Sequence, residues 1–193
     1  MSDDILVRDG RHTLLASGNT VTIDGNDTYD LTAVKAVSFG ANRRHVGVTY
    51  QGTDFTVQLK QEKRSRMFIF STDHRDENID EYQESWRQLV ARIDAIAIPR
   101  LADEIAASVR AGETVSFGPA GAKVVLSPEG VKKGGLFSKP VPWSQVTRTD
   151  LDDRTIRVLG RKTPGAEETV IGGVHVAEWN SYVLPHVVSR LKG

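Results

Sequence analysis

One long stretch of the chain carries a helical pattern of hydrophobic positions, and short alternating segments lie on both sides of it. Between residues 76 and 112, large apolar side chains recur at steps of mostly three and four residues. This period places them on one face of an amphipathic helix. The members of this apolar stripe are Ile79, Tyr82, Trp86, Leu89, Val90, Ile93, Ile96, Leu101, Ile105 and Val109.

Charge and backbone chemistry predict how this helical stretch begins, breaks and ends. Five acidic residues lie between Asp76 and Glu84, where the positive end of the helix dipole stabilises negative charge. Pro99 lacks an N–H and its ring clashes with the preceding turn, so we expect a break, a kink or the start of a new helix there. Gly112 is suited to the C-terminal cap. The expected arrangement is a helix to about residue 96 and a connecting helix over residues 97–112.

The residues before the helix have the pattern of short strands separated by turn-forming pairs. Apolar and polar residues alternate over residues 55–59, as in a strand with one buried face. The segment 51–54 has the composition of a hairpin turn. The expected strands are residues 5–7, 13–16, 21–23, 29–39, 46–50, 55–59 and 67–70.

After the helix the strand pattern returns, and the chain ends in a second helical pattern. The expected strands are residues 114–117, 123–126, 141–149, 155–159 and 168–171. From residue 179 to residue 191 an apolar side chain recurs every four positions, which predicts a helix. Pro185 interrupts that pattern. Either the helix begins only a few residues before it, capped by Asn180 or Ser181, or it is kinked there.

The two flanks of the long helix resemble each other in pattern more than in residue identity. Three pairs of segments match: 20–25 with 123–130, 29–34 with 141–146, and 55–59 with 155–159. Each half then ends in an amphipathic helix, which can cover the open end of a bent sheet. The sequence therefore predicts a mostly β, α+β protein of two bent antiparallel units, residues 1–96 and 113–193. Each unit is expected to be a partly open barrel closed by its C-terminal helix.

One segment of the second half resembles a known superfamily. The run Val141-Pro-Trp-Ser-Gln-Val146 resembles the proline-tryptophan strand of bacterial pleckstrin-homology (PH)-like domains, and the turn at 127–131 and the helix after Trp179 support the resemblance. Residues 93–101 and 111–118 are similar to an uncharacterised bacterial family that joins such a helix to such a domain. The resemblance implies tandem PH-like units with a tendency to bind ligands, and it implies no particular activity. Members of that family are often membrane-anchored, and this chain departs from them because it has no apolar run near the roughly 18 residues that span a bilayer.

Composition narrows the classes of function. Lys plus Arg and Asp plus Glu both number 25, so no overall field draws the chain to nucleic acid or to an anionic membrane. Cysteine is absent, which removes thiol catalysis and Cys-ligated metal and fits a reducing compartment. The N-terminus is acidic and lacks the apolar centre of a signal peptide, so the expected location is the cytoplasm.

The stretch 132–139 is the most suggestive candidate for binding, because three lysines surround two apolar residues there. The apolar side chains could insert into a surface while the ammonium groups attract phosphates or carboxylates. Alternatively, the apolar pair begins the next strand and packs inward while the lysines are solvated. The spaced Lys and Arg signature with which PH domains bind phosphoinositides is not present. The candidate residues are Lys132, Lys133, Leu136, Phe137 and Lys139.

Two further basic clusters lie at 43–45 and 60–66. Charged hairpin tips also discourage edge-to-edge aggregation, so both clusters have an explanation that needs no ligand. Arg43 and Arg44 remain candidate partner-binding residues. The clusters contain no aromatic stacking series, and no helix has a basic recognition face, so nucleic acid is not an expected partner.

Residue sets with catalytic or metal-binding spacing are missing from the sequence. The five histidines are scattered without HExxH spacing, and no G-x-S-x-G elbow occurs. Residues 118–123 lack the G-K-[ST] ending of a phosphate loop, and residues 150–154 lead into a sequence without the glycine and glutamate of a calcium loop, so both are expected to be turns. We therefore expect no cofactor and no metal. The predicted function is a non-enzymatic module that recruits a protein partner or an acidic ligand. The alternatives are binding to an anionic membrane through 132–139 and an enzyme with an unrecognised site.

Overall fold

The structure is a computed structural model that describes residues 4–73, 79–119, 123–135, 138–161, 163 and 165–193. The chain divides into two compact units, residues 1–97 and 98–193. Antiparallel strands dominate both units, and helices are fewer, so the predicted mostly β, α+β class is confirmed. Within the described residues, none of the four sheets closes into a barrel.

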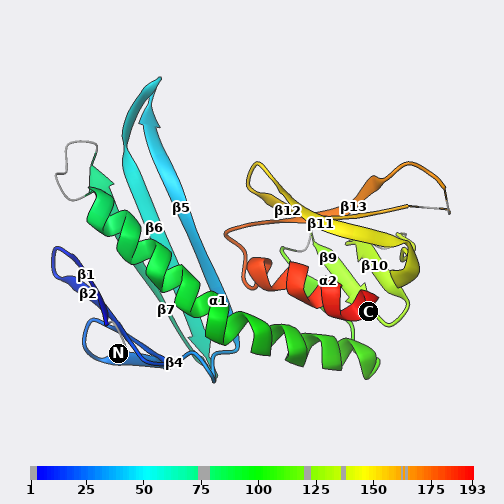
Figure 1. The fold of residues 1–193 in the computed structure, drawn as a ribbon, viewed down its shortest axis with the longest axis horizontal. Coiled ribbons are helices and arrows are strands. Elements are labelled where there is room, and N and C mark those ends of the chain that lie inside the picture. Colours follow the sequence, from blue (N-terminus) through cyan, green and yellow to red (C-terminus); the bar gives the residue numbers. More distant parts are fainter. Residues whose placement is uncertain (1–3, 74–78, 120–122, 136–137, 162, 164) are drawn as a thin grey trace. The chain divides into compact units, whose positions relative to one another are not determined.

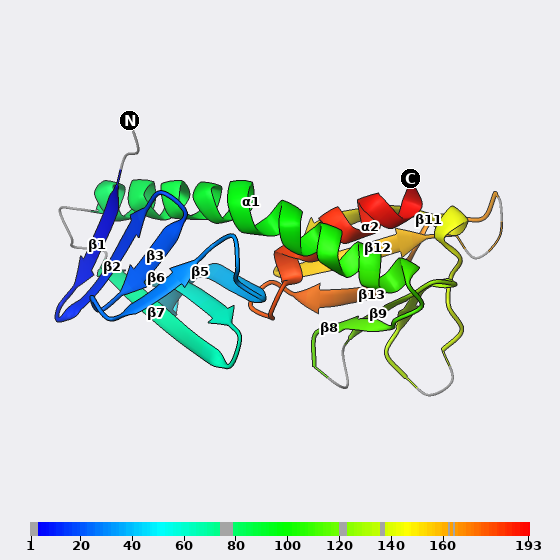
Figure 2. The ribbon, with the colours of Figure 1, turned by 90° about the horizontal axis from the view of Figure 1, so that it is seen from below.

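The first unit consists of two antiparallel meanders and the N-terminal part of a long helix (Figure 1). The strands of the first meander are β1 (Ile5–Asp9), β2 (His12–Ser17), β3 (Thr20–Ile23) and β4 (Asp27–Asp30). Those of the second are β5 (Ala36–Val46), β6 (Thr49–Gln61) and β7 (Arg64–Asp73). Both meanders lie on the same side of the helix, α1 (Ile79–Arg110), in Figure 2.

The core of the first unit is an aromatic cluster between β5–β7 and α1. Phe55 on β6 stacks on Phe70 of β7 at a ring-centre distance of 4.9 Å. Trp86 of α1 meets Phe55 at 5.4 Å and Phe39 of β5 at 6.3 Å. The three phenylalanines are buried, whereas Trp86 is half-buried. Such rings contribute large apolar areas and geometry-specific contacts, and they hold the predicted apolar face of α1 against the sheet.

α1 runs without interruption from Ile79 to Arg110 with Pro99 inside it, where the sequence predicted a break, a kink or the start of a new helix. Proline at this position removes one helical hydrogen bond. The residues around it, Ala97, Ile98, Leu101 and Ala102, are all buried. Because tertiary packing supplies most of the stability of a helix in a protein, this burial outweighs the missing bond. The division between the two compact units falls within α1, between Ala97 and Ile98.

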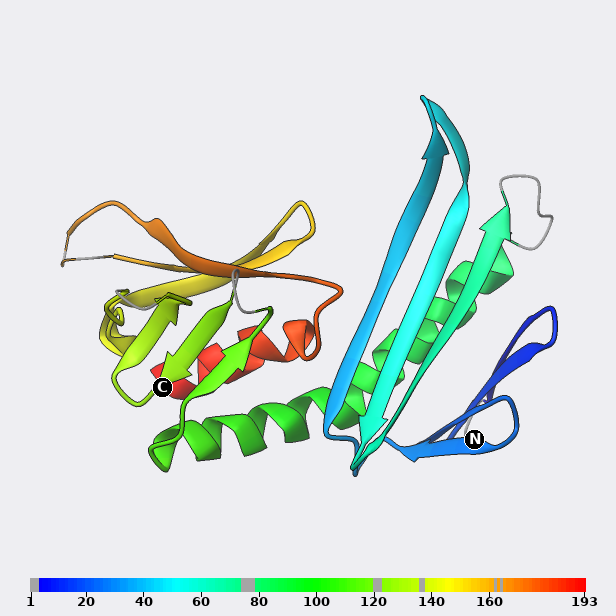
Figure 3. The same cartoon turned by 180° about the vertical axis from the view of Figure 1, so that it is seen from behind.

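The second unit repeats the order of meander, meander and helix with shorter elements. The first meander comprises β8 (Val115–Phe117), β9 (Val124–Ser127) and β10 (Gly130–Lys133), and an isolated bridge joins Val131 to Val141. The second comprises β11 (Val146–Asp152), β12 (Thr155–Gly160) and β13 (Thr169–His175). The last helix, α2 (Leu184–Lys192), packs on β11 and β12 and is drawn in red in Figure 3.

The predicted strand at 46–50 and the predicted hairpin turn at 51–54 are both wrong. The turn lies at Gly47–Val48, and β6 already begins at Thr49. Gly52 lies inside β6 with a left-handed φ of 142°. A Cβ added there would lie 1.8 Å from the carbonyl oxygen of Thr72. Glycine at this position therefore permits the close approach of β7, which is a common role of glycine within a strand.

The proline-tryptophan segment is also not the strand that the sequence predicted. Trp143–Gln145 forms a 3₁₀ turn, and β11 begins only at Val146. Pro142, with φ at −56°, precedes this turn, and the indole Nε1 of Trp143 donates a hydrogen bond of 3.0 Å to the carbonyl oxygen of Ser127. Tryptophan therefore anchors the turn to the β9–β10 hairpin. The strand β10 was not predicted.

α2 begins at Leu184 with Pro185 in its first turn, which confirms the first of the two predicted alternatives for this helix. Proline is tolerated in the first turn because the N–H groups there have no helical partner. Neither predicted cap forms. Asn180 has a left-handed backbone with φ at 59°, and the hydroxyl of Ser181 donates instead to the carbonyl oxygen of Val176 at 2.6 Å.

Candidate functional site

A groove between β11 and α2 is the candidate functional site of the second unit. It encloses about 290 Å³ and is open to solvent. The apolar part of its lining comes from Pro185 and Val188 of α2, and polar side chains from both elements form the rest. The residues that line this groove are Thr147, Arg148, Thr149, Pro185, Val188, Ser189 and Lys192.

The strand that borders the groove is an edge strand, because the order in its sheet is β11-β12-β13. The turn at 153–154 is closed by the pair Asp152 and Thr155. In a two-residue hairpin the closing pair exchanges hydrogen bonds, and the pairs beyond it alternate between bonded and non-bonded. The backbone N–H and C=O groups of Leu151 and Thr149 therefore point away from β12, toward the free edge.

The register of β11 shifts between Val146 and Arg148, which leaves Thr147 as an irregular position beside the groove. The ammonium group of Lys192, in the last turn of α2, donates a hydrogen bond to the carbonyl oxygen of Thr147. One outward carbonyl of the edge is thus satisfied by a long and flexible side chain. A backbone N–H of a partner can take over this hydrogen bond without a change in the fold, because the ammonium group of lysine is attached through a flexible four-carbon side chain.

Arg148 is held at the rim of the groove by two carboxylates. Its guanidinium lies 2.8 Å from Glu168 and 3.1 Å from Asp150. Asp150 in turn receives two hydrogen bonds from Arg157, of 2.8 and 2.9 Å. A forked arrangement of this kind fixes the orientation of both groups. The carboxylates of Glu168 and Asp150 therefore fix the position of the Arg148 side chain.

The hydrogen bonds of this network keep its carboxylates ionised. The hydroxyl of Thr147, at 2.5 Å, and the guanidinium of Arg148 lower the pKa of Glu168 below its ordinary value. The hydrogen bonds and charge of Arg157, with a smaller effect of Arg148, lower the pKa of Asp150. Donors and cations favour the charged form of an acid. The network therefore remains charged at neutral pH. Its role is to hold the side chains beside the groove in place.

The predicted candidates of the stretch 132–139 are only partly a loop. Lys132 and Lys133 lie on β10, opposite Val125 and Val124 of β9, with Lys132 half-buried and Lys133 exposed. Lys139 is exposed. The residue before it, Ser138, donates a hydrogen bond from its hydroxyl to the carbonyl oxygen of Lys133. The sequence misplaced the first two lysines because the strand Gly130–Lys133 contains one large apolar residue, Val131, and therefore no alternation to detect. The other two candidates, Leu136 and Phe137, lie outside the described residues.

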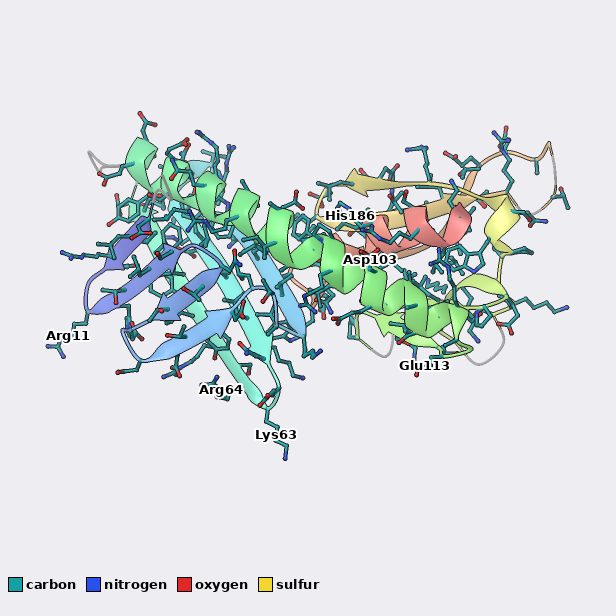
Figure 4. The ribbon with its side chains drawn as sticks, turned by 60° about the horizontal axis from the view of Figure 1, so that its bottom comes forward. Arg11, Lys63, Arg64, Asp103, Glu113 and His186 are labelled. Carbon is teal, nitrogen blue, oxygen red and sulfur yellow. The ribbon has the colours of Figure 1, made fainter. Side chains whose placement is uncertain are left out.

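The predicted candidates Arg43 and Arg44 lie on β5 in the first unit and belong to neither the groove nor the 132–139 stretch. Arg44 lies 2.9 Å from Asp54 and donates to the carbonyl oxygen of Thr72 at 2.9 Å, so it is a structural cross-link between β5, β6 and β7. Arg43 is exposed. The cluster 60–66 forms the β6–β7 hairpin end as expected, with Lys63 projecting away from the unit in Figure 4.

The groove itself was missed by the sequence reasoning. The turn near Asp152 was recognised, and so were parts of the strands on both sides of it. The free edge of β11 follows from its place in the sheet order, and the groove follows from the packing of α2 beside it. Both depend on contacts far apart in the chain. The four-residue period of α2 marked its buried face, to which Val183 and Val187 belong, and gave no signal for Pro185 and Val188, which line the groove.

Within the described ranges, no group of three His, Asp or Glu side chains is placed to hold a metal ion. No helix among the described elements combines the length and the apolar character needed to cross a bilayer. The chain matches no protein-family model, and a search of curated proteins found no significant relative.

Proposed function

We propose that the chain is a non-enzymatic binding module of two PH-like units, and that its second unit recruits a protein partner by accepting an extended segment along β11. The observation that carries this proposal is the groove beside the free edge of β11, with an apolar side on α2. Addition of a strand to an exposed sheet edge is a common mode of peptide recognition, in which the main chain gives affinity and alternate side chains give specificity.

The PH-like interpretation is supported by the order of elements in the two units. Each has a first meander, a second three-stranded meander and then a helix. In the second unit, the bridge at Val141 stands where the fourth strand stands in the first. The matched segments 29–34 and 141–146 occupy the same place, and each makes a tight turn: the N–H of Val34 bonds to Asp30, and that of Gln145 to Pro142. A fold shared by many proteins settles no ligand, whereas the groove indicates one by its shape and chemistry.

The groove supplies the three features that an extended partner needs. Outward backbone groups at Thr149 and Leu151 offer hydrogen bonds, and Pro185 and Val188 offer apolar contact for a side chain that points into the groove. Lys192 can release the carbonyl of Thr147 to a partner N–H and pair with a partner carboxylate. The favoured ligand is therefore an extended protein segment with an apolar residue next to an acidic one.

Selection of peptides from a random display library on the intact protein, followed by affinity measurement, tests this proposal. Ser189→Trp fills the groove from an exposed position of α2, and His186→Trp is the matched control, because His186 is exposed on the same helix and does not line the groove. We expect the first to weaken binding of the selected peptides by about tenfold or more, the equivalent of about 1.4 kcal/mol, and the second to leave it unchanged.

A second pair of variants tests the backbone contact. Thr149→Pro removes an N–H that points to the free edge, a position at which proline is tolerated in a strand. Thr149→Val removes only the hydroxyl and keeps that N–H. We expect the proline variant alone to lose peptide affinity, by about fivefold for a hydrogen bond of about 1 kcal/mol. Peptides that bind Ser189→Trp and Thr149→Pro as tightly as the wild type, or a selection that yields none above background, would refute the proposed role of the groove.

A further inference from the structure

The β5–β6 hairpin continues as a two-stranded ribbon beyond the end of β7. The last residue of β7, Asp73, pairs with Gly52 of β6. Beyond that point, His45 pairs with Tyr50 and Val46 with Thr49. Figure 1 shows this ribbon extending past the rest of the first unit. A two-stranded ribbon gains little stability from its own contacts, so the projection needs a reason outside the core.

The end of the ribbon is apolar. Val46 is 70% exposed and Val48 is 100% exposed, on either side of the turn glycine Gly47. Hairpin turns ordinarily carry Asn, Asp, Gly, Pro or Ser, each of which suits turn geometry or solvent. Two β-branched apolar side chains at the outermost point of a unit form a patch that water does not stabilise. They are the apolar element of a candidate contact surface.

The ribbon below this apolar tip is basic. Residues 42–53 contain Arg43, Arg44 and His45 and no acidic residue. Arg44 is engaged by Asp54 at 2.9 Å, whereas Arg43 makes no ion pair with any residue that the structure describes. Within residues 42–53 the formal charge is therefore positive although the whole chain has a net charge of zero, whereas Asp54 follows directly and the first turn of α1 carries Asp80 and Glu81.

The basic side chains line a hollow of about 280 Å³ at the base of the tip. The hydroxyls of Tyr50 and Thr53 lie 2.7 Å apart in this hollow, and the ring of His45 meets that of Tyr50 edge-on at 5.7 Å. Guanidinium, hydroxyl and amide groups are the donors that proteins use for phosphate oxygens. The residues that line the hollow are Arg43, His45, Tyr50, Thr53, Ile79 and Gln83.

We propose that the tip of the β5–β6 hairpin binds an anionic membrane surface. Val46 and Val48 enter the boundary between head groups and acyl chains, and a lipid phosphate lies in the hollow against Arg43 and His45. The geometry favours a lipid surface because it offers an apolar layer directly beneath a layer of negative charge, in the order in which the tip presents valines and then cations. This site lies in the first unit and is independent of the peptide groove proposed above.

The strength of this attachment is limited by its size. One apolar tip and one cation, Arg43, resemble a single lipid anchor, which gives only weak and reversible binding. The attraction of the cations is screened by salt over about 8 Å at physiological ionic strength. We therefore expect binding that requires anionic lipid, weakens as salt is raised and reverses on dilution.

The absence of cysteine from the chain permits a direct test with a single label. Val48→Cys, carrying an environment-sensitive fluorophore, is mixed with phosphatidylcholine vesicles, with or without about one third phosphatidylserine. We expect a blue shift and a rise in emission only with the anionic vesicles. Arg11→Cys with the same label is the control, because Arg11 is exposed at the end of the β1–β2 hairpin of the same unit and projects from it in Figure 4. It should not respond.

A matched pair of charge reversals tests the role of the cations. In the labelled protein, Arg43→Glu should weaken vesicle binding by about tenfold or more, since it replaces an attraction with a repulsion. Lys63→Glu makes the same change in charge at the exposed end of the β6–β7 hairpin, and it should reduce binding by less than about twofold if the attraction is local. Equal losses for the two variants would mean that only net charge matters, and the proposal would fall.

Three other results would also overturn the proposal. An unchanged label with anionic vesicles, or an equal response to pure phosphatidylcholine, would show that the tip does not recognise an anionic surface. Sedimentation of the wild-type protein without lipid is the second readout. A dimer that becomes a monomer when Val46 and Val48 are both replaced by serine would assign the tip to self-association instead.

Discussion

Trp86 is one of the residues that attach α1 to the sheet of the first unit. Its ring contacts Phe55, Phe70 and Phe39 at centre distances of 5.4, 6.0 and 6.3 Å. Trp86→Ala would leave a gap beside three buried rings, and we expect a loss of about 3 kcal/mol in the free energy of unfolding by urea, at the lower end for such changes because the indole is half-buried. Glu81→Ala, at an exposed position of the same helix, should change it by less than about 0.5 kcal/mol. A loss below about 1 kcal/mol for Trp86→Ala would mean that the apolar face of α1 does not support the unit.

Gly52 and Gly47 lie in the same hairpin, and glycine is required at each for a different reason. Both have a positive φ, of 142° and 60°. A Cβ at Gly52 would lie 1.8 Å from the carbonyl oxygen of Thr72, whereas one at Gly47 would meet nothing within 4 Å. We expect Gly47→Ala to destabilise by about 1 kcal/mol, the cost of left-handed backbone, and Gly52→Ala by about 3 kcal/mol or more, because β7 must also move. Equal losses in thermal unfolding would show that β7 does not approach Gly52.

The carboxylates under the groove make the second unit sensitive to acid. The folded-state pKa values of Glu168 and Asp150 are lowered, by Thr147 and Arg148 in the first case and by Arg157 in the second. A lowered folded pKa contributes stability that is complete above the unfolded pKa and is lost as pH falls through the folded value. We expect stability in urea to decline below about pH 4.5. Glu168→Gln should flatten this decline, whereas Glu113→Gln, at an exposed carboxylate, should leave it intact.

At the scale of the element, the strands and helices that could be predicted from the sequence are those that a short-range pattern of residues encodes. Strands β1, β2, β3 and β12 and both helices follow alternation or the helical period within a few neighbouring residues. The β5–β6 turn was misplaced, because glycine serves a turn at Gly47 and a close contact at Gly52, and only the register with β7 distinguishes them. The groove and the hairpin hollow could not be predicted, since each combines residues from elements distant in sequence. Arg43 was singled out by its charge, but its hollow and the exposed valines above it emerge only in three dimensions.

Pro99 is the one proline within α1, and the helix continues through it. Because the helix is uninterrupted, the carbonyl of Ala95 lacks the N–H that another residue would provide. We expect Pro99→Ala to restore that hydrogen bond and the helix propensity, and to raise the free energy of unfolding by about 1 to 2 kcal/mol. Circular dichroism in urea gives this value directly. A loss of stability would show instead that the packing of Ala97 and Ile98 requires the local geometry that proline imposes.

At the scale of the whole molecule, the boundary of the second unit depends on whether residues 98–110 belong to its core. The sequence assigned these residues to a connector and began the second unit at 113, whereas the compact unit begins at Ile98. Ile98, Leu101 and Val109 are buried. Arg190 of α2 reaches back to them through the carboxylate of Asp103 and the carbonyl oxygen of Pro99. The helical segment 98–110 is thus partly buried and is attached to α2 through the contacts of Arg190.

A comparison of two fragments tests this boundary. Full burial of an aliphatic side chain contributes about 1.5 to 3 kcal/mol, so loss of the three buried side chains of 98–110 removes an amount comparable to the whole stability of a domain, about 5 to 15 kcal/mol. We expect the fragment 98–193 to unfold cooperatively in urea and to show dispersed amide resonances by NMR, and the fragment 113–193 to show neither. Asp103→Ala in the longer fragment should lower its stability by no more than about 1 kcal/mol, because the carboxylate is exposed. If 113–193 folds as well as 98–193, the C-terminal part of α1 is a connector after all, and the second unit stands without it.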